Sequence, residues 1–292
     1  MTFEYKYKNI KKLVKKELEY IEDFMVQQIK VKEPLNSFIV NFLTAPSKRI
    51  RPVLSILYYK SKNDNISKDQ LKSLTAIELI HNASLIHDDI IDNSDTRRGL
   101  KTISHEFGNH LGVISGDYLL SRAMNIMTEL GSIDLLKNLS AVLNKMCIGE
   151  INQNFAKFQI GTIEDYIEKS KNKTAYLFQS AILAPFITDN TEWNDNASQF
   201  GLNTGIAFQI RDDLLNLISN DKTKPNKNDI AEGIYNAPVI YSQSAENYLS
   251  GVEKTKNLLS NYINRAAFNI SDLPDNQYKE GLKQFLELLN HD

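Results

Sequence analysis

Residues 85–99 read LIHDDIIDNSDTRRG and combine a helical pattern of apolar residues with a dense group of aspartates. Four positions separate Asp88 from Asp92, so both carboxylates share one helix face, and Asp89 lies about 100° further round. Like charges at that spacing repel each other, and the dipole disfavours anions near a helix C-terminus. Selection for stability alone would avoid this arrangement. By themselves the three aspartates fit a bound cation and an exposed acidic helix end equally well.

A second acidic group lies in residues 208–221, which read FQIRDDLLNLISND. Asp212 and Asp213 head this group, and Asn216 follows four positions after Asp212. Two acid-rich helix ends in one helical chain can face each other across a cavity. Carboxylate oxygens suit Mg²⁺, which readily keeps phosphate oxygens as further ligands. The two groups together predict a metal site for a diphosphate.

Candidate phosphate-binding residues accompany both acidic groups. His81 lies seven positions, or two helical turns, before Asp88 on the same helix face. Each candidate alone is more often a surface charge, but acids that need metals beside bases that need phosphates indicate one site. The candidates are Lys48, Arg51, His81, Arg97, Arg98, Lys173, Thr174 and Lys224.

Apolar residues recur at helical spacing along almost the whole chain. Ser67 and Gln70 form a capping box that opens a long helix. The predicted helices include 67–92, 109–130, 133–160, 162–169, 173–187, 196–219, 238–264 and 276–289, with polar loops at 61–66, 93–101 and 220–229. Only 12 glycines and 7 prolines are present, which argues against an all-β fold with many tight turns. We therefore predict an all-α protein with a single domain over residues 1–292.

Composition excludes several other classes of protein. The 34 basic and 36 acidic residues give a net charge of −2, which argues against a dedicated nucleic-acid binder. Cys147 is the only cysteine, which rules out an intrachain disulfide framework and suits a reducing compartment. No signal peptide is apparent, and no apolar run approaches the roughly 18 residues of a membrane span. These features predict a cytoplasmic protein without stable membrane insertion.

The order of the motifs resembles that of the polyprenyl synthetase family, the trans-isoprenyl diphosphate synthases. The matching blocks are KRIRP, ELIHNASLIHDDIID, DTRRG, GDYLL, GEINQ, KTAYLF, FQIRDD and NDIAEG, all between residues 44 and 241. The resemblance implies a helical bundle of the isoprenoid synthase type around a central cavity. It also implies a magnesium-dependent prenyltransferase, in which an allylic diphosphate ionises with the help of about three Mg²⁺ ions and isopentenyl diphosphate attacks the cation.

The resemblance also assigns roles to single residues. Asp88, Asp92 and Asp212 would bind the metal directly, and Asp89 and Asp213 would support them. The residues that would hold isopentenyl diphosphate are Lys48, Arg51, His81 and Arg98. The residues that would hold the allylic diphosphate are Arg97, Lys173, Gln209 and Lys224, and Thr174 would help to position the ionising carbon. Fixed cations stabilise the charge on a departing diphosphate, which agrees with these roles.

Three positions depart from the family pattern. Asn216 stands where the second acidic motif usually ends in aspartate, and a neutral amide is a weaker ligand for a hard cation. Ser47 replaces a usual glycine before Lys48, and Ile234 stands where short-chain members often carry lysine. The region after Pro238 is also shorter than usual.

The length of the product depends on the helix that carries Asp88. Ala83 and Ser84 lie about one turn before Asp88, where bulky side chains would stop a growing hydrocarbon tail. Both are small, and the DDIID spacing resembles that of the hexa-, hepta- and octaprenyl members. Each buried methylene gains roughly 0.8 kcal/mol, so we expect growth to about six to eight isoprene units.

Two other readings stay open. A class I terpene cyclase would share the fold and the metals but would not need the four residues assigned to isopentenyl diphosphate. The chain could also be a non-catalytic or partner-dependent subunit of a heteromeric synthase, and Asn216 would then be a trace of lost activity. The resemblance implies a homodimer, with a heteromer containing a small regulatory subunit as the alternative.

Overall fold

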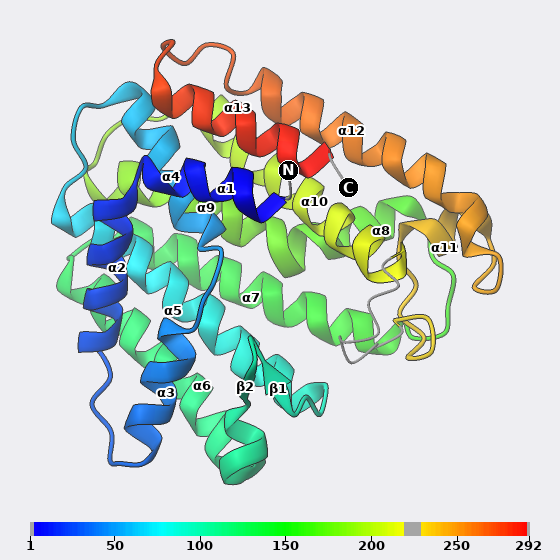
Figure 1. The fold of residues 1–292 in the computed structure, drawn as a ribbon, viewed down its shortest axis with the longest axis horizontal. Coiled ribbons are helices and arrows are strands. Elements are labelled where there is room, and N and C mark those ends of the chain that lie inside the picture. Colours follow the sequence, from blue (N-terminus) through cyan, green and yellow to red (C-terminus); the bar gives the residue numbers. More distant parts are fainter. Residues whose placement is uncertain (1–2, 219–228, 291–292) are drawn as a thin grey trace. The chain divides into compact units, whose positions relative to one another are not determined.

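The computed structural model describes residues 3–218 and 229–290, and helices make up most of this range (Figure 1). The helices are α1 (Phe3–Lys12), α2 (Lys15–Gln27), α3 (Leu35–Thr44), α4 (Ile50–Lys62), α5 (Lys68–Ile91), α6 (Ile103–Glu129), α7 (Ile133–Phe155), α8 (Ile163–Ser170), α9 (Tyr176–Thr188), α10 (Asp195–Ile218), α11 (Ala237–Ser242), α12 (Val252–Phe268) and α13 (Gln277–Asn290). In the described residues the only strands are β1 (Thr96–Arg97) and β2 (Leu100–Lys101). The prediction of an all-α fold is confirmed.

The chain divides into two compact units. The N-terminal unit contains residues Lys11–Lys137 and Ala181–Glu192, and the C-terminal unit contains Met1–Ile10, Asn138–Ser180 and Trp193–Asp292. Each unit is described by itself below, and a single domain over residues 1–292 stays a prediction. No helix in the described parts of either unit is long and apolar enough to cross a membrane.

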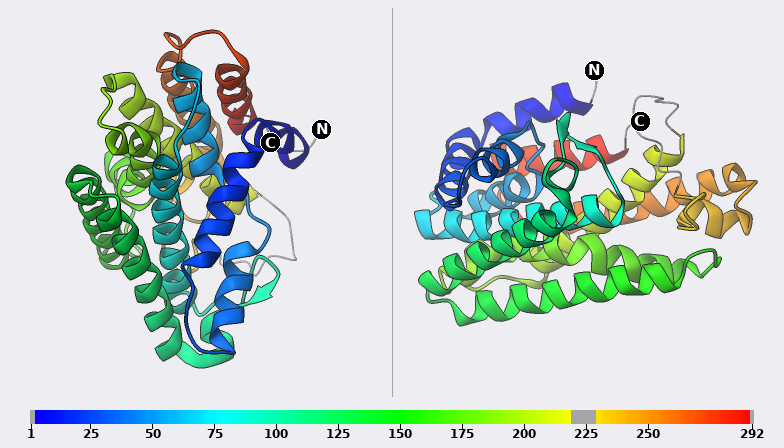
Figure 2. Two further views of the ribbon diagram at one scale, coloured as in Figure 1. Left: turned by 90° about the vertical axis from the view of Figure 1, so that its left-hand side faces the viewer. Right: turned by 90° about the horizontal axis from the view of Figure 1, so that it is seen from below.

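Helix α5 is the central helix of the N-terminal unit. It begins with the predicted capping box, in which Ser67 accepts from the Gln70 backbone N–H and the Gln70 side chain accepts from the Ser67 N–H. Helix α6 packs along α5, as both figures show (Figures 1 and 2). A Cβ atom on Gly116 would lie 2.2 Å from Nε2 of His87, so any larger residue at this position would force the His87 ring to move. This contact lies one residue before Asp88.

A two-residue hairpin follows the first acidic group. Arg98 and Gly99 connect β1 to β2, with φ angles of 53° and 77°. Positive φ at both positions matches the right-handed twist of paired strands and is easiest for glycine at the second position. The sequence predicted a loop over 93–101, and the pairing of Thr96 with Lys101 gives part of it a fixed geometry.

In the C-terminal unit, α10 packs against α12 and against a short π-helix, η1 (Lys171–Ala175). The π-helix joins α8 to α9 without the break that the sequence predicted between residues 169 and 173. A Cβ atom on Gly205 of α10 would lie 2.5 Å from Cα of Ala175, so α10 and η1 are in close backbone contact.

Two predicted helices of this unit end early. The helix predicted over 133–160 ends at Phe155, because Phe158 has a φ of 62° and donates its N–H to the carbonyl of Gly233 at 2.8 Å. The helix predicted over 238–264 is wrong. It divides into α11 and α12, because Gln243 has a φ of 54° and the Ser242 hydroxyl accepts from the Ser244 N–H. A tertiary contact ends the first helix, and a local turn divides the second.

Candidate active site

The basic motif KRIRP surrounds the start of α4 in the N-terminal unit. Lys48 is exposed and Arg51 is half-buried, whereas Arg49 between them is buried with a φ of 52°. The Arg49 guanidinium pairs with Glu22 at 3.1 Å and with Glu78 at 3.3 Å, and it donates to the Leu43 carbonyl. Sequence reasoning missed Arg49, although its place between two predicted ligands was a signal. It anchors the segment that carries Lys48 and Arg51.

His81 is half-buried on α5, among arginines from two segments, the start of α4 and the β1–β2 hairpin. Burial is the main reason why its pKa lies well below the ordinary 6.5, and the positive charges of Arg51, Arg98, Arg49 and Arg97 lower it further. A neutral imidazole can still donate one hydrogen bond. The structure thus gathers a neutral donor and several cations around one part of α5, which is the chemistry of an anion site.

The first acidic group divides into two environments at the end of α5. Asp88 is half-buried, and Asp92, the residue directly after α5, is exposed. Asp89 is buried and pairs with Nε of Arg97 at 2.6 Å. Asp89 therefore orients Arg97, a predicted ligand of the allylic diphosphate.

Arg98 leaves the hairpin in another direction. Its Nη1 lies 3.4 Å from the Asn82 amide oxygen, and its guanidinium stacks over Phe42 at 5.6 Å from the ring centroid. Asn82 is one residue from His81 on α5. Arg98 is thus held against the helix that carries His81. The resemblance assigned both residues to the same ligand.

The second acidic group, in the C-terminal unit, divides in the same way. Asp212 is exposed, whereas Asp213 is buried and accepts from the Tyr166 hydroxyl at 2.7 Å and from Nε2 of Gln209 at 2.9 Å. Burial raises the pKa of Asp213 to about 6, and the nearby Lys169 ammonium and the two hydrogen bonds limit the rise. Tyr166 is a second residue that sequence reasoning missed.

The π-helix η1 carries Lys173 and Thr174. Lys173 pairs with Glu150 of α7 at 3.0 Å, and the Thr174 hydroxyl donates to Oε1 of Gln209 at 2.5 Å. Insertions of this kind within helices are frequent at functional sites. Both ends of the Gln209 amide therefore contact side chains of the same unit, Thr174 at one end and Asp213 at the other.

Lys169, one turn before Lys173, connects this region to the NDIAEG motif. Its Nζ donates to the Asn236 amide oxygen at 2.8 Å, and the Asn236 amide nitrogen donates to Asp229 at 2.8 Å. Burial is the main reason why the pKa of Lys169 is lowered. Sequence reasoning quoted the motif but gave Asp229 no role.

The remaining predicted residues fall in three places. Ala83 is fully buried, and Ser84 is half-buried with its hydroxyl donating to the His81 carbonyl. Asn216 is exposed on α10, one turn after Asp212. Lys224 lies outside the described residues.

The predicted metal ligands are oxygen donors, as Mg²⁺ requires. Asp88, Asp92 and Asp212 all have at least part of their surface accessible. Asp88 and Asp92 belong to the N-terminal unit and Asp212 to the C-terminal unit. Within residues 3–218 and 229–290, no three His, Cys, Asp or Glu side chains gather closely enough to hold an ion. The fit to magnesium therefore rests on the type of the donor atoms, which are carboxylate oxygens.

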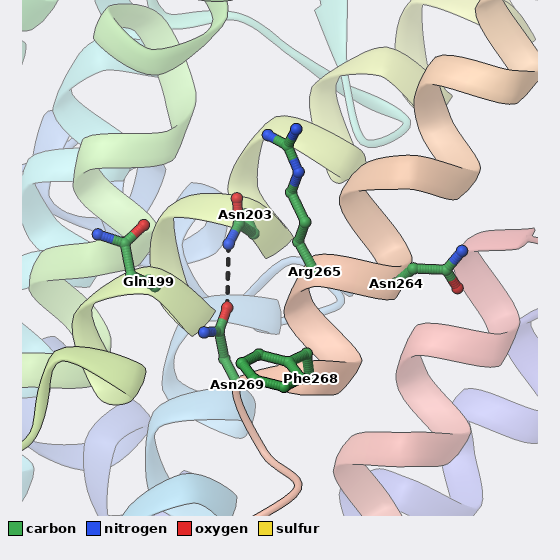
Figure 3. A pocket seen from close by; sticks show the side chains of 6 residues that line it. All are labelled: Gln199, Asn203, Asn264, Arg265, Phe268 and Asn269. Atoms are coloured by element: carbon green, nitrogen blue, oxygen red, sulfur yellow. Dashed lines mark hydrogen bonds between the residues drawn. The ribbon is translucent and has the colours of Figure 1, made fainter.

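A pocket of about 370 Å³ lies between α10 and α12, away from these residues (Figure 3). Asn203 donates to the amide oxygen of Asn269 at 3.0 Å inside it, and Asn269 donates in turn to Asn196. These amides connect the two helices, and none of the predicted site residues lines the pocket.

Comparison with known proteins identifies the family. The family model described as polyprenyl synthetase matches residues 32–274. A prenyl transferase of Cyanidium caldarium is 30% identical, and the match covers 95% of this chain and 96% of the relative. The decaprenyl-diphosphate synthase of Dictyostelium discoideum is 30% identical over 84% of this chain and 60% of its own length.

The fold leads to the same family. The crystal structure of heptaprenyl diphosphate synthase from Staphylococcus aureus superposes with a TM-score of 0.88 at 25% identity, covering 96% of this chain and 98% of that one. The motifs that hold Asp88, Lys173 and Asp212 all lie inside the stretch that the family model matches. The chain therefore belongs to the polyprenyl synthetase family, the trans-isoprenyl diphosphate synthases.

Proposed function

We propose that this protein is a magnesium-dependent prenyltransferase that condenses isopentenyl diphosphate with an allylic diphosphate into a trans-polyprenyl diphosphate. The observation that carries the proposal is the group of basic side chains around His81, on the same helix as Asp88 and Asp92. A terpene cyclase has no second diphosphate to hold. The basic group therefore favours chain elongation.

Isopentenyl diphosphate is assigned to the basic side of the N-terminal unit. Lys48, Arg51 and Arg98 supply positive charge, and a neutral His81 donates a hydrogen bond without adding a further charge to the crowded cluster. Arg49 fixes the segment that carries Lys48 and Arg51, so their charges need little reorganisation when the ligand binds.

The allylic diphosphate is assigned to Arg97, Lys173 and the aspartates Asp88, Asp92 and Asp212. When bound, Mg²⁺ would neutralise charge on the departing diphosphate and so help the allylic C–O bond to break. Asp89 keeps Arg97 in one orientation, and Glu150 does the same for Lys173.

The last proton needs no dedicated base in this proposal. Attack by the isopentenyl double bond forms the new C–C bond and leaves a tertiary cation. Loss of a proton to the released diphosphate then restores a double bond. Lys173 and Arg97 would hold that diphosphate near the reacting carbons, which makes the proton transfer local.

The product is proposed to be long. Ser84 is small and half-buried on α5, which supports an open path for a growing tail. Relatives are named decaprenyl, solanesyl and heptaprenyl diphosphate synthases, but others are named short-chain or geranylgeranyl synthases, so the names do not fix the length of the product. Our expectation of about six to eight isoprene units stays a prediction, based on continued gain from methylene burial.

The test is mass spectrometry of the products formed by the purified chain with Mg²⁺, isopentenyl diphosphate and a series of allylic primers. We expect long prenyl diphosphates, and we expect Asp88→Ala to lower turnover by several orders of magnitude. Asp134→Ala is the matched control, because Asp134 is an exposed acid that pairs with the exposed Lys137. Absence of product with every primer would favour the non-catalytic subunit.

The quaternary structure is a separate prediction. The resemblance implies a homodimer or a heteromer with a small regulatory subunit. Light scattering on the purified chain measures its mass in solution and so tests for the homodimer. Turnover that appears only after a partner is added would indicate the heteromer.

A further inference from the structure

Four side chains of the C-terminal unit form one continuous chain of hydrogen bonds. Tyr166 of α8 donates to Oδ2 of Asp213 at 2.7 Å, and Gln209 of α10 donates to Oδ1 of the same carboxylate at 2.9 Å. Thr174 of η1 then donates to Oε1 of Gln209 at 2.5 Å. Tyr166, Asp213 and Thr174 are buried and Gln209 is half-buried, so water has limited access to these bonds.

The chemistry of the groups fixes the direction of each bond. Carboxylate oxygens only accept, so the amide nitrogen of Gln209 must face Asp213 and its oxygen must face Thr174. The single hydroxyl proton of Thr174 is thereby directed to Gln209. Burial raises the pKa of Tyr166 well above 10, so its hydroxyl keeps the proton that it donates.

We propose that Tyr166 is a positioning residue that acts through Asp213 and Gln209 to leave only the lone pairs of the Thr174 hydroxyl available to the ionising allylic carbon. The inference rests on the proposed function. It assigns a role to Tyr166, which no predicted site contained, and a shared role to two residues that had been expected to act separately.

The backbone supports the same arrangement. Gly205, one turn before Gln209 on α10, is in such close contact with Ala175 that a Cβ atom would lie 2.5 Å from its Cα. Thr174 precedes Ala175, so its backbone is held close to the helix that carries Gln209. The side-chain bonds then need only to set the rotation of the hydroxyl.

The direction of that hydroxyl matters because the carbon becomes positive. An oxygen lone pair stabilises developing positive charge, whereas an O–H proton pointing the same way would oppose it. Such preoriented dipoles act most strongly where water is excluded and no reorganisation is needed. With its chain to Gln209 broken, the hydroxyl can rotate, and part of the stabilisation is lost.

The test compares two diphosphate ligands by isothermal titration calorimetry in the presence of Mg²⁺. One ligand carries an ammonium nitrogen at the position of the allylic cation, and the other is its neutral carbon isostere. The ratio of their affinities reports stabilisation of positive charge and needs no turnover. We expect Tyr166→Phe and Thr174→Val each to lower this ratio roughly tenfold, the size expected for a hydrogen bond involving a charged group.

Tyr262→Phe is the matched control. Tyr262 is a buried tyrosine of α12 in the same unit. Arg265 stacks on its ring, which phenylalanine keeps, and its hydroxyl interacts with Tyr241 rather than with the chain from Tyr166 to Thr174. This variant should retain the wild-type ratio. Gln209→Met breaks the chain at its middle link and should lower the ratio even if Tyr166→Phe fails to fold.

The possible outcomes separate the two proposals. If Thr174→Val lowers the ratio but Tyr166→Phe and Gln209→Met do not, the hydroxyl acts without the chain and the inference is wrong. If none of the three variants lowers it, the lone-pair role is also wrong, while the proposed function stands because both ligands still bind. If the wild-type protein binds neither ligand, the proposed function itself fails.

Discussion

Replacing Arg49 by methionine tests how the basic segment before α4 is held. The guanidinium, whose side chain is 1% exposed, pairs with Glu78 at 3.3 Å and with Glu22 at 3.1 Å. It also donates to the Leu43 carbonyl. Arg49→Met keeps an unbranched apolar stem in place of the arginine stem but removes every one of these bonds.

The magnitude follows from the exposure of the two partners. The Glu78 side chain is 3% exposed, so the variant removes the direct partner of a buried carboxylate, which costs up to about 3–5 kcal/mol. The positive charges of Arg51, Arg98 and Lys11 also act on Glu78 and reduce this cost. The Glu22 side chain is 43% exposed, and solvent screening limits its share to less than about 1 kcal/mol. Glu78 therefore determines the loss of stability.

Methionine at both positions supplies the decisive comparison. A buried ion pair replaced by apolar side chains of similar size is often neutral in stability, because neither charge has to be desolvated. We therefore expect Arg49→Met with Glu78→Met to recover most of the free energy of unfolding that Arg49→Met loses. Lys137→Met, which breaks the exposed pair with Asp134, is the control and should cost less than about 1 kcal/mol.

Urea denaturation followed by far-ultraviolet circular dichroism measures these changes, with the slope of the transition checked for each variant. A loss of less than about 1 kcal/mol for Arg49→Met would refute the reasoning, because it would mean that Glu78 is not desolvated. A double variant less stable than the single variant would refute it as well. It would show that packing around the guanidinium, rather than its charge, stabilises this segment.

Three further predictions concern His81, Asn216 and Ser84. The lowered pKa of His81 means that below pH 6.5 the unfolded chain takes up a proton that the folded chain does not, so His81 costs stability as the pH falls, by up to about 1.4 kcal/mol per unit. His81→Gln should lose this part of the pH dependence, measured as the free energy of unfolding in urea at several pH values. The same dependence on pH in the variant and in the wild-type protein would contradict the prediction. Asn216→Asp should lower the Mg²⁺ concentration for half-maximal turnover, because it adds an exposed carboxylate one turn after Asp212; a higher requirement would contradict the metal assignment. Ser84→Phe should shorten the prenyl products seen by mass spectrometry, and unchanged lengths would exclude Ser84 from the path of the tail.

Local sequence signals predicted much of the fold. The Ser67–Gln70 capping box forms as expected, because both of its hydrogen bonds lie within four residues. Helix ends that depend on distant contacts were missed. Phe158 leaves the helical conformation where its N–H meets the carbonyl of Gly233, and no pattern around residue 158 contains that partner.

The same limit applies to the candidate site. Motif order led to Lys48 and Arg51, but the roles of the residues between and around them depend on partners far along the chain. Arg49 meets Glu78 from another helix, and Tyr166 meets Asp213. Such pairs can be found only when the two helices that carry them are placed side by side.

Adjacent aspartates illustrate what spacing can and cannot determine. Neighbouring residues of a helix point about 100° apart, so two consecutive aspartates cannot both face the same ligand. Asp88 and Asp212 are accessible, whereas Asp89 and Asp213 are buried. The helical period predicts that the two carboxylates of each pair differ, but not which one is turned inward.

The inner aspartate of each pair serves a function that its charge alone does not reveal. Asp89 orients the guanidinium of Arg97, and Asp213 accepts from Tyr166 and Gln209. A buried carboxylate is costly unless donors satisfy it, so each inner aspartate needs partners held in fixed positions. Of those partners, Arg97 and Gln209 are residues that we assign to the allylic substrate. The inner carboxylates thus connect the rigidity of the helices to the orientation of the groups that would meet the diphosphate and the cation.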